Sequence, residues 1–551
     1  MKRQGCEHKT GEENRDPGPG RSKMTEMEIE PKDRRLPGKK LMEEKRMTVS
    51  SSFWFAFAGA LVLGIIGHGM ALFNKLSFHD DIFSIFMTGS TINVGRWMLY
   101  ILVQLEKWFY GNGHFSIPAV NGVWSLVCIG LSAGVIVQHF RIHSNTLSAL
   151  LGAVMAIFPA VASFFGFMFT VHYYMLALLM TVAGGVLICA EGSGAWGKKT
   201  AGVLLCGCAV GIYQAFIPVL LMIVLLDLIR NLLREEEKTG AAVKRALVLA
   251  LCVAGTMGVY FAGNRFFLWK ENVRLDDYLG ISEMGTASLG WYLERAGMAY
   301  REFFLPTHNT LWDMYPQALY NVYRLMLCLD LLLGAVRIVQ TWKRSPSKAL
   351  LLTAVLALVP LGCNFIFLMS EKIHSLMVYG QVMQAVLLVM LADRTEIPVL
   401  CLNRWTRRGA ALLLALCGIM CFRYDNQCYL KIVFQQQEAI TWNTTLVTRI
   451  ESAEGYTDEL PVAFVNRENM QDRNLHNMTE FDFLTLSTYD QNIREYLNDW
   501  AWEAFLARWC GFGPKTAAPE TVADWPEVQA MPSYPDDGSI QIIRDVVVVK
   551  F

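Results

Sequence analysis

Runs of roughly 20 apolar residues alternate with short polar loops through the first three quarters of the chain. A run of that length lets one α-helix cross the hydrocarbon core of a bilayer. We predict about eleven spans. Their approximate bounds are 53–73, 118–139, 146–163, 170–190, two short helices within 200–233, 246–263, 318–336, 349–369, 375–391 and 409–422. The pattern predicts a mainly α fold class, a polytopic helical membrane protein.

Two of the connections between spans are long, at residues 74–117 and 264–317. Each holds an amphipathic stretch, near 97–109 and near 288–304, which predicts a helix lying along the membrane surface. The segment 200–233 is too long for one span and short for two, and it is interrupted at its middle. It therefore predicts a tight hairpin of two short helices.

The polar ends of the chain predict two further regions. Residues 1–46 are rich in Gly, Pro, Lys and Glu without apolar periodicity, which predicts a disordered cytoplasmic tail before the membrane domain at 47–422. Residues 423–551 mix polar and apolar positions and predict a small extracytoplasmic α/β domain. Its expected elements are helices at about 427–452 and 492–509, a strand at 461–466 and two strands within 539–551.

Basic residues cluster in alternate loops, and these loops are expected on the cytoplasmic side. The bias places the N-terminus inside and the C-terminus outside.

Composition agrees with a membrane protein, because 53% of the residues are hydrophobic and 18% charged, against about a quarter charged in soluble domains. The 49 basic and 49 acidic residues balance, so there is no electrostatic argument for a nucleic-acid partner.

The adjacent carboxylates Asp80 and Asp81 follow the first predicted span on the outer side. One interpretation is a solvated acidic loop. The other is a catalytic base at the mouth of a membrane-embedded active site, since carboxylates are costly to place in lipid and often mark function there. A carboxylate pair is also able to bind a divalent metal, but no third acidic ligand stands at a convincing spacing, so no metal ligand is assigned.

Other outer residues are candidates for binding a phosphate or a sugar. Lys372, in a short outer turn, is either a phosphate-binding cation or a lysine that extends from a helix end toward water. Arg96 is either a phosphate or sugar contact or an interfacial anchor. The remaining candidates, each with a packing or interfacial alternative, are Glu371, His374, Tyr213 and Gln214. The second acidic pair, Asp276 and Asp277, is read as a solvated helix start or as an acceptor contact.

These segments occur in a recognisable order: the Asp80-Asp81 pair, then Gly95-Arg96-Trp97, then Tyr213-Gln214, and finally Met531 to Ser539 followed by a valine-rich strand with Lys550. From about residue 50 to 551 the chain resembles the bacterial Gtr type II glucosyltransferases, which modify O-antigens. The resemblance implies a GT-C architecture in the bacterial plasma membrane. It also implies a polyprenyl-phosphate sugar donor, with glucose as the expected sugar, and a polysaccharide or glycolipid acceptor at the cell surface.

The chemistry implied by the resemblance needs a base for the acceptor hydroxyl, donors for the leaving phosphate and an apolar groove for the lipid. Asp80 or Asp81 would be the base, and Lys372 the first candidate for the phosphate. The alternative function is a transporter or flippase. Transporters often carry an internal repeat with charges near the midplane, whereas here the charges lie at the outer ends of spans and no convincing repeat is found.

Overall fold

The computed structural model describes residues 49–77, 80–111, 114–234, 238–276, 287–305, 316–370, 373–394, 400–469, 497 and 499–551. The predicted tail, 1–46, lies outside these residues, as do the candidates Glu371 and Lys372. The described part forms one unit that begins at Val49.

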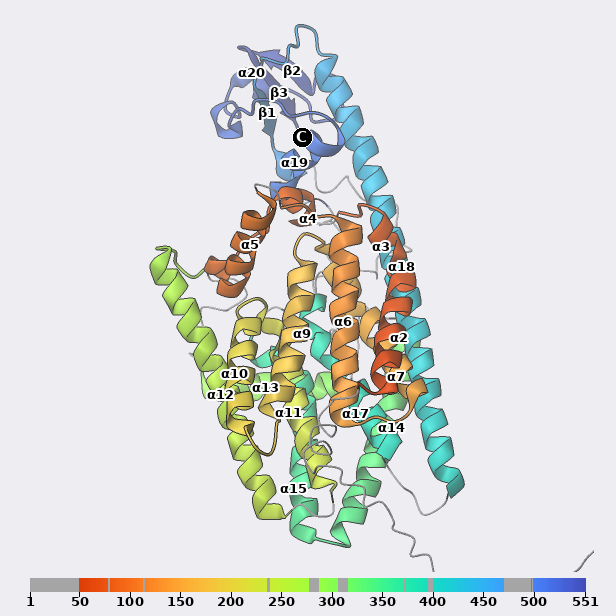
Figure 1. Cartoon of the computed structure of the whole chain (residues 1–551). Coiled ribbons are helices and arrows are strands. Elements are labelled where there is room, and N and C mark those ends of the chain that lie inside the picture. Colours follow the sequence, from red (N-terminus) through yellow and green to blue (C-terminus); the bar gives the residue numbers. More distant parts are fainter. Residues whose placement is uncertain are drawn as a thin grey trace, which may run out of the picture. The chain divides into compact units, whose positions relative to one another are not determined.

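Helices make up most of the described chain (Figure 1). The α-helices are α2 (Ser51–Gly67), α3 (Gly69–Phe73), α4 (Asp80–Phe83), α5 (Trp97–Tyr110), α6 (Pro118–Phe140), α7 (Asn145–Ile157), α8 (Pro159–Gly166), α9 (Val171–Ile188), α10 (Ala195–Val210), α11 (Ile217–Leu232), α12 (Thr239–Lys270), α13 (Leu289–Phe304), α14 (Gln317–Trp342), α15 (Pro346–Ala357), α16 (Val359–Cys363), α17 (Met383–Arg394), α18 (Leu400–Glu451), α19 (Asp499–Trp509) and α20 (Pro526–Gln529). The 3-10 helices are η1 (Ser84–Phe86), η2 (Ile92–Val94), η3 (Gln214–Phe216), η6 (Phe365–Leu368), η7 (Ser375–Val382) and η11 (Pro519–Thr521).

Among the described residues, 8 helical segments are long and apolar enough to cross a membrane. They are Pro118–Phe140, Asn145–Gly166, Val171–Ile188, Gln214–Leu232, Thr239–Lys270, Pro346–Cys363, Ser375–Asp393 and Asn403–Glu451, with the shorter apolar helix Ser51–Gly67 in addition. Helices α10 and α14, which occupy further predicted spans, are not in this set. The molecule is thus a helical membrane protein, and the count of about eleven spans stays a prediction.

Local expectations from the sequence match the helices closely. The segment 200–233 contains α10 and α11, which are separated by a turn at Tyr213 and by η3. The two amphipathic stretches form α5 and α13. Pro218 stands in the first turn of α11, where its missing N–H costs nothing.

Helix α2 packs closely against α7 through small residues. A Cβ added at Gly59 would lie 2.2 Å from the carbonyl oxygen of Ala149, and one added at Gly152 would lie 2.0 Å from that of Ala56. Small residues at matched positions let two helix backbones approach in a membrane, where packing rather than the hydrophobic effect holds helices together.

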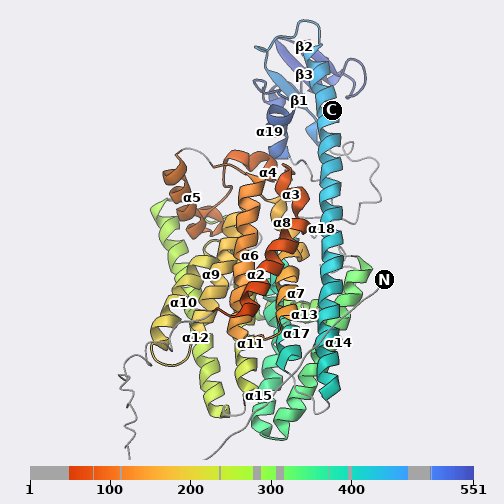
Figure 2. The same cartoon turned by 45° about the vertical axis from the view of Figure 1, so that its right-hand side comes forward.

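The C-terminal region rises from the bundle on α18, a single helix of 52 residues. Figure 2 shows this helix running from the bundle to the strands without a break. The expected boundary at residue 423 falls inside it, and the predicted last span and the predicted helix 427–452 are parts of one helix.

A three-stranded sheet completes this region, as β1 (Val462–Val465), β2 (Ile540–Ile543) and β3 (Val546–Lys550). Its order is β1-β3-β2, with β1 parallel and β2 antiparallel to β3. The fully buried Trp502 of α19 packs on Phe464 of β1 and on Phe551. The predicted strands and the helix that covers them are therefore present.

Candidate functional site

Asp81 is fully buried, and its carboxylate ties α4 to three other segments. One oxygen accepts hydrogen bonds from Ser116 Oγ at 2.7 Å and from the backbone N–H of Phe169 at 2.9 Å. The other oxygen is paired with Lys75 Nζ, which also donates to Ser116 Oγ at 2.9 Å. These contacts occupy both carboxylate oxygens of Asp81 with donors from the protein itself.

Asp80 begins α4, on the same turn as Asp81, and is partly exposed. The two neighbouring aspartates are therefore in different surroundings, although the sequence gives no means of separating them. Asp81 has the environment of a structural anchor, whereas Asp80 is the more accessible carboxylate.

The Gly95-Arg96-Trp97 segment and the Tyr213-Gln214 pair meet in the fold. Gln214 Nε2 donates to the carbonyl oxygen of Val94 at 3.1 Å and to the hydroxyl of Tyr260 at 3.2 Å. Gly95 has a φ of +74°, and a Cβ there would lie 2.6 Å from the Tyr260 hydroxyl. Only glycine suits that turn, because the backbone is left-handed and a protein side chain fills the space beside it.

Trp97 fixes the other side of the same turn. Its ring stacks on Phe267 with centroids 5.8 Å apart. A Cβ at Gly211 or Gly263 would lie 2.7 or 2.4 Å from a Trp97 ring carbon. Trp97 therefore needs glycine on both α12 and the end of α10, which explains why an aromatic residue follows Arg96 here.

The guanidinium of Arg96 lies beside two tyrosine rings. Its central carbon is 5.6 Å from the ring centroid of Tyr174 and 5.7 Å from that of Tyr213. These two rings stack at 4.2 Å. A cation near the faces of aromatic rings is held electrostatically, so Tyr213 serves to position Arg96.

The N-terminal end of α9 connects the two groups of candidates. Phe169, just before α9, bonds to Asp81, and Tyr174, in its first turns, contacts Arg96. The second acidic pair also reaches this region, since the backbone N–H of Asp276 donates to the carbonyl oxygen of Asn93 at 2.8 Å. Asp277 lies outside the described residues.

The turn that carries Lys372 and Glu371 is described only at its flanks. Arg295 of α13 donates to the carbonyl oxygens of Phe367, at 2.8 Å, and of Ser370. On the far side His374 is partly exposed, and the next residue, Ser375, lies 2.6 Å from Ser163 Oγ. The described residues before and after positions 371–372 are thus bonded to α13 and α8.

Several residues of this region were not predicted as candidates. Lys75, Ser116 and Arg295 read in the sequence as ordinary polar loop or helix residues, and nothing in their spacing marks them. The same holds for Glu106, whose carboxylate accepts a hydrogen bond from Tyr173 and lies 3.2 Å from His114 Nδ1. Each acquires its role only from segments distant in the chain.

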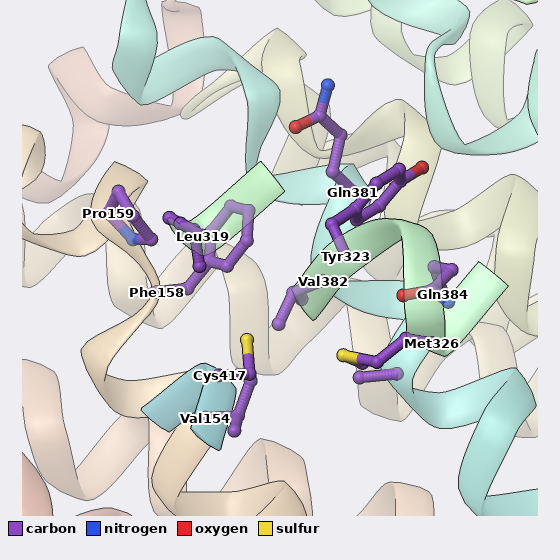
Figure 3. A pocket seen from close by; sticks show the side chains of 11 residues that line it. Val154, Phe158, Pro159, Leu319, Tyr323, Met326, Gln381, Val382, Gln384 and Cys417 are labelled. Atoms are coloured by element: carbon purple, nitrogen blue, oxygen red, sulfur yellow. The ribbon is translucent and has the colours of Figure 1, made fainter. Parts of the chain in front are cut away.

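An apolar pocket lies deeper in the bundle (Figure 3). Its lining comes from α7, α8, α14, α17, α18 and neighbouring residues, namely Val154, Phe158, Pro159, Leu319, Tyr323, Met326, Gln381, Val382, Gln384, Ala385 and Cys417. Aromatic ring contacts link it to Arg96, through Tyr213, Phe164, Tyr379 and Phe158. The cavity has a volume of about 20 Å³, room for about one water molecule, so it is too small for a sugar or a lipid chain.

Within the described residues, one group has ligand atoms close enough to hold a metal ion. His139, Cys189 and Asp227 offer atoms that lie within 4.8 Å of one another. Both oxygens of Asp227 are already used, one by Arg230 and the other by Arg245, and His139 Nε2 lies 3.1 Å from the first. We interpret this group as a structural ion-pair network, since two arginines would repel a cation.

The residues at the C-terminal end of the chain bond to one another. Lys550 Nζ donates to the carbonyl oxygens of Gln529 and Met531, at 2.8 and 2.7 Å. The backbone N–H of Tyr534 donates to the carbonyl oxygen of Lys550 at 2.7 Å. The stretch Met531 to Ser539 therefore closes the C-terminal sheet.

Comparison with known proteins identifies the class. The sequence model of the Glucosyl transferase GtrII family matches residues 69–389, more than half of the chain. The chain belongs to this family, which confirms the resemblance drawn from the motifs. No curated protein matches it, and no solved structure does.

Proposed function

We propose that this glucosyltransferase-family protein transfers a sugar, glucose, from a polyprenyl-phosphate donor to a cell-surface polysaccharide or glycolipid on the extracytoplasmic side of the membrane. The observation that carries the proposal is the family match, whose range includes Asp80, Asp81, Arg96, Tyr213, Gln214 and Lys372. The arrangement of α4 supports the chemistry, because it offers one anchored and one accessible carboxylate at the end of the bundle.

In the proposed reaction Asp80 takes the proton of the acceptor hydroxyl. The acceptor oxygen bonds to the anomeric carbon of the sugar as the bond from that carbon to the phosphate oxygen breaks, and polyprenyl phosphate leaves. A cation beside that phosphate would stabilise its developing charge. Lys372 remains our sequence-based candidate for this role, and Arg96, held by two tyrosines, is the candidate among the described residues.

The assay that tests this function uses the purified protein in detergent with an acceptor glycolipid and several polyprenyl-phosphate sugars. We expect polyprenyl-phosphate glucose to be consumed with release of polyprenyl phosphate, because the proposed reaction breaks that bond. The same assay with a nucleotide-activated glucose should show no consumption. Consumption of the nucleotide sugar alone would contradict the proposed donor. Movement of intact lipid-linked sugar across proteoliposomes without transfer would instead support the flippase alternative.

The proposed topology rests on which end of the bundle carries the basic loops. Figures 1 and 2 place α4 and α19 at one end and the connection between α14 and α15 at the other. That connection carries Lys343 and Arg344, and Lys348 follows in the first turn of α15, as expected near a cytoplasmic loop. Arg508 of α19 bonds to α4, so the C-terminal region and the aspartate pair share one side of the membrane.

A reporter enzyme that works only outside the cytoplasm should therefore be active when fused after Phe551. The same reporter inserted after Arg344 should be inactive, and a reporter restricted to the cytoplasm should give the reverse pattern. Cytoplasmic activity at Phe551 would show that α4 and its aspartates face inward, which the extracytoplasmic reaction does not allow.

A further inference from the structure

Arg508 joins the C-terminal region to the helix that carries the two aspartates. It lies in the last turn of α19. Its Nη1 donates to the carbonyl oxygens of Ile82 and, at 2.8 Å, of Phe83, the last two residues of α4. Its guanidinium carbon is 5.1 Å from the ring centroid of Phe86, in η1. One side chain thus contacts both the end of α4 and the turn after it.

Helix α4 depends on such contacts because it is only 4 residues long. An isolated helix of one turn is unstable in water, since its nucleation cost is not recovered. Its last carbonyl groups have no partner within the helix and must find donors elsewhere. Arg508 supplies a donor to two of them, and its cationic N–H groups make stronger hydrogen bonds than neutral donors.

The two ends of α4 are therefore fixed from opposite sides. On the bundle side Asp81 is bound by Ser116 and Phe169, and on the other side α4 is held by Arg508. Asp80 is the first residue of this one-turn helix, directly before Asp81. Its position follows from how firmly α4 is held.

Arg508 is itself carried by a rigid support. Trp502, one and a half turns earlier on α19, is fully buried, and its Nε1 donates to Asn443 Oδ1 of α18 at 2.8 Å. Helix α18 continues unbroken into the bundle. Helix α18 therefore fixes the position of Arg508, and with it the contact to α4, relative to the membrane domain.

The positive charge of Arg508 also favours its place beside α4, which carries two aspartates. Burial lowers the pKa of Arg508 below its usual value, and the nearby Asp81 carboxylate raises it in opposition. The guanidinium stays protonated at neutral pH, because arginine ordinarily titrates far above it. A permanent positive charge therefore stands next to the aspartate pair.

We propose that Arg508 is a positioning residue, through which the C-terminal domain sets the place of Asp80 relative to the acceptor hydroxyl. This inference rests on the proposed function, in which Asp80 is the base. It gives the C-terminal domain an indirect part in catalysis, exerted through α4.

The test compares Arg508→Met and Arg508→Lys in the purified full-length protein. Arg508→Met should lower kcat by about 10- to 100-fold, since small displacements of a reacting group have effects of that size. The KM for the lipid donor should change by less than about 3-fold, because α4 is not assigned to donor binding, which corresponds to under about 0.7 kcal/mol. Arg508→Lys keeps a charge and a donor, so it should recover part of kcat.

Arg449→Met is the matched control. Arg449 also lies over an aromatic ring, Tyr534 at 5.3 Å, and donates to a backbone carbonyl, that of Pro535 at 2.6 Å, but both contacts stay inside the C-terminal domain. We expect this variant to keep the wild-type kcat. An equal loss in Arg449→Met and Arg508→Met would overturn the proposal in favour of a general weakening of the domain.

A wild-type kcat in Arg508→Met would also overturn the proposal. If Arg508→Met does not fold, Arg508→Lys tests the positioning role instead. A lowered kcat with an unchanged KM for the donor supports this role, and a wild-type kcat refutes it. Including Asp80→Asn in the same assay separates a failure of the proposed role of Asp80 from a failure of the proposed role of Arg508. If the wild-type protein transfers no sugar, the proposed function fails. If Asp80→Asn is active, Asp80 is not the base and the positioning role falls with that assignment, while the transfer itself stands. If Asp80→Asn is inactive while Arg508→Met is normal, only the positioning role fails.

Discussion

Replacing Asp80 with Asn should abolish measurable sugar transfer while leaving membrane insertion and donor affinity intact. Asn has nearly the same shape as Asp but cannot accept the proton of the acceptor hydroxyl. Loss of a general base typically lowers a rate by about 100- to 10,000-fold. The measurement is single-turnover transfer from polyprenyl-phosphate glucose, with donor binding determined separately on the same protein.

The expectation for folding follows from the surroundings of Asp80. It is partly exposed at the start of α4, whereas Asp81 is fully buried and bound by Ser116 and the N–H of Phe169. Asp80→Asn should therefore have a thermal unfolding temperature close to that of the wild type. Asp536→Asn, a change at an exposed aspartate of the C-terminal domain, serves as the control and should keep full activity. Near-normal transfer by Asp80→Asn would remove this residue from the role of base.

The sequence predicts the helices and strands better than it predicts their contacts. Apolar runs and turn residues are local signals, so the hairpin at Tyr213, the amphipathic helices α5 and α13, and the terminal strands could all be placed. The continuity of α18 could not. Asp425 and Lys431 end the apolar run in the sequence, but both are buried in the structure, and helical periodicity continues through them.

The candidate site likewise has features that the sequence predicts and features that it does not. The order of the motifs predicts that Gly95-Arg96-Trp97 and Tyr213-Gln214 belong together, and the bonds of Gln214 to Val94 and Tyr260 bring them into contact. The sequence cannot show which aspartate is anchored. Asp81 is bound by a backbone N–H, at Phe169, which leaves no trace in a side-chain pattern. Arg508 contacts α4 across a separation of 425 residues, which no local pattern reports.

Asp81→Ala should differ from Asp80→Asn: it should lower the stability of the protein, and it should reduce transfer without abolishing it, because it releases the bundle-side anchor of α4. The change leaves the buried Ser116 hydroxyl and the Phe169 N–H without their acceptor, and it leaves Lys75 without its partner. Lys75 is 30% exposed and can turn toward water, so the two buried donors carry most of the cost. We expect a destabilisation of about 3 kcal/mol. It should appear as a drop of several degrees in the unfolding temperature in detergent.

A second substitution tests the physical reason for this loss. Removing one partner of a buried pair leaves a charge unpaired, whereas removing both costs less. The double variant Asp81→Ala with Lys75→Met should therefore be more stable than the sum of the two single changes predicts.

The folded fraction of Asp81→Ala should still transfer sugar at a measurable rate, because Asp80 remains. A variant with wild-type stability and no transfer would mean that Asp81, rather than Asp80, is the base.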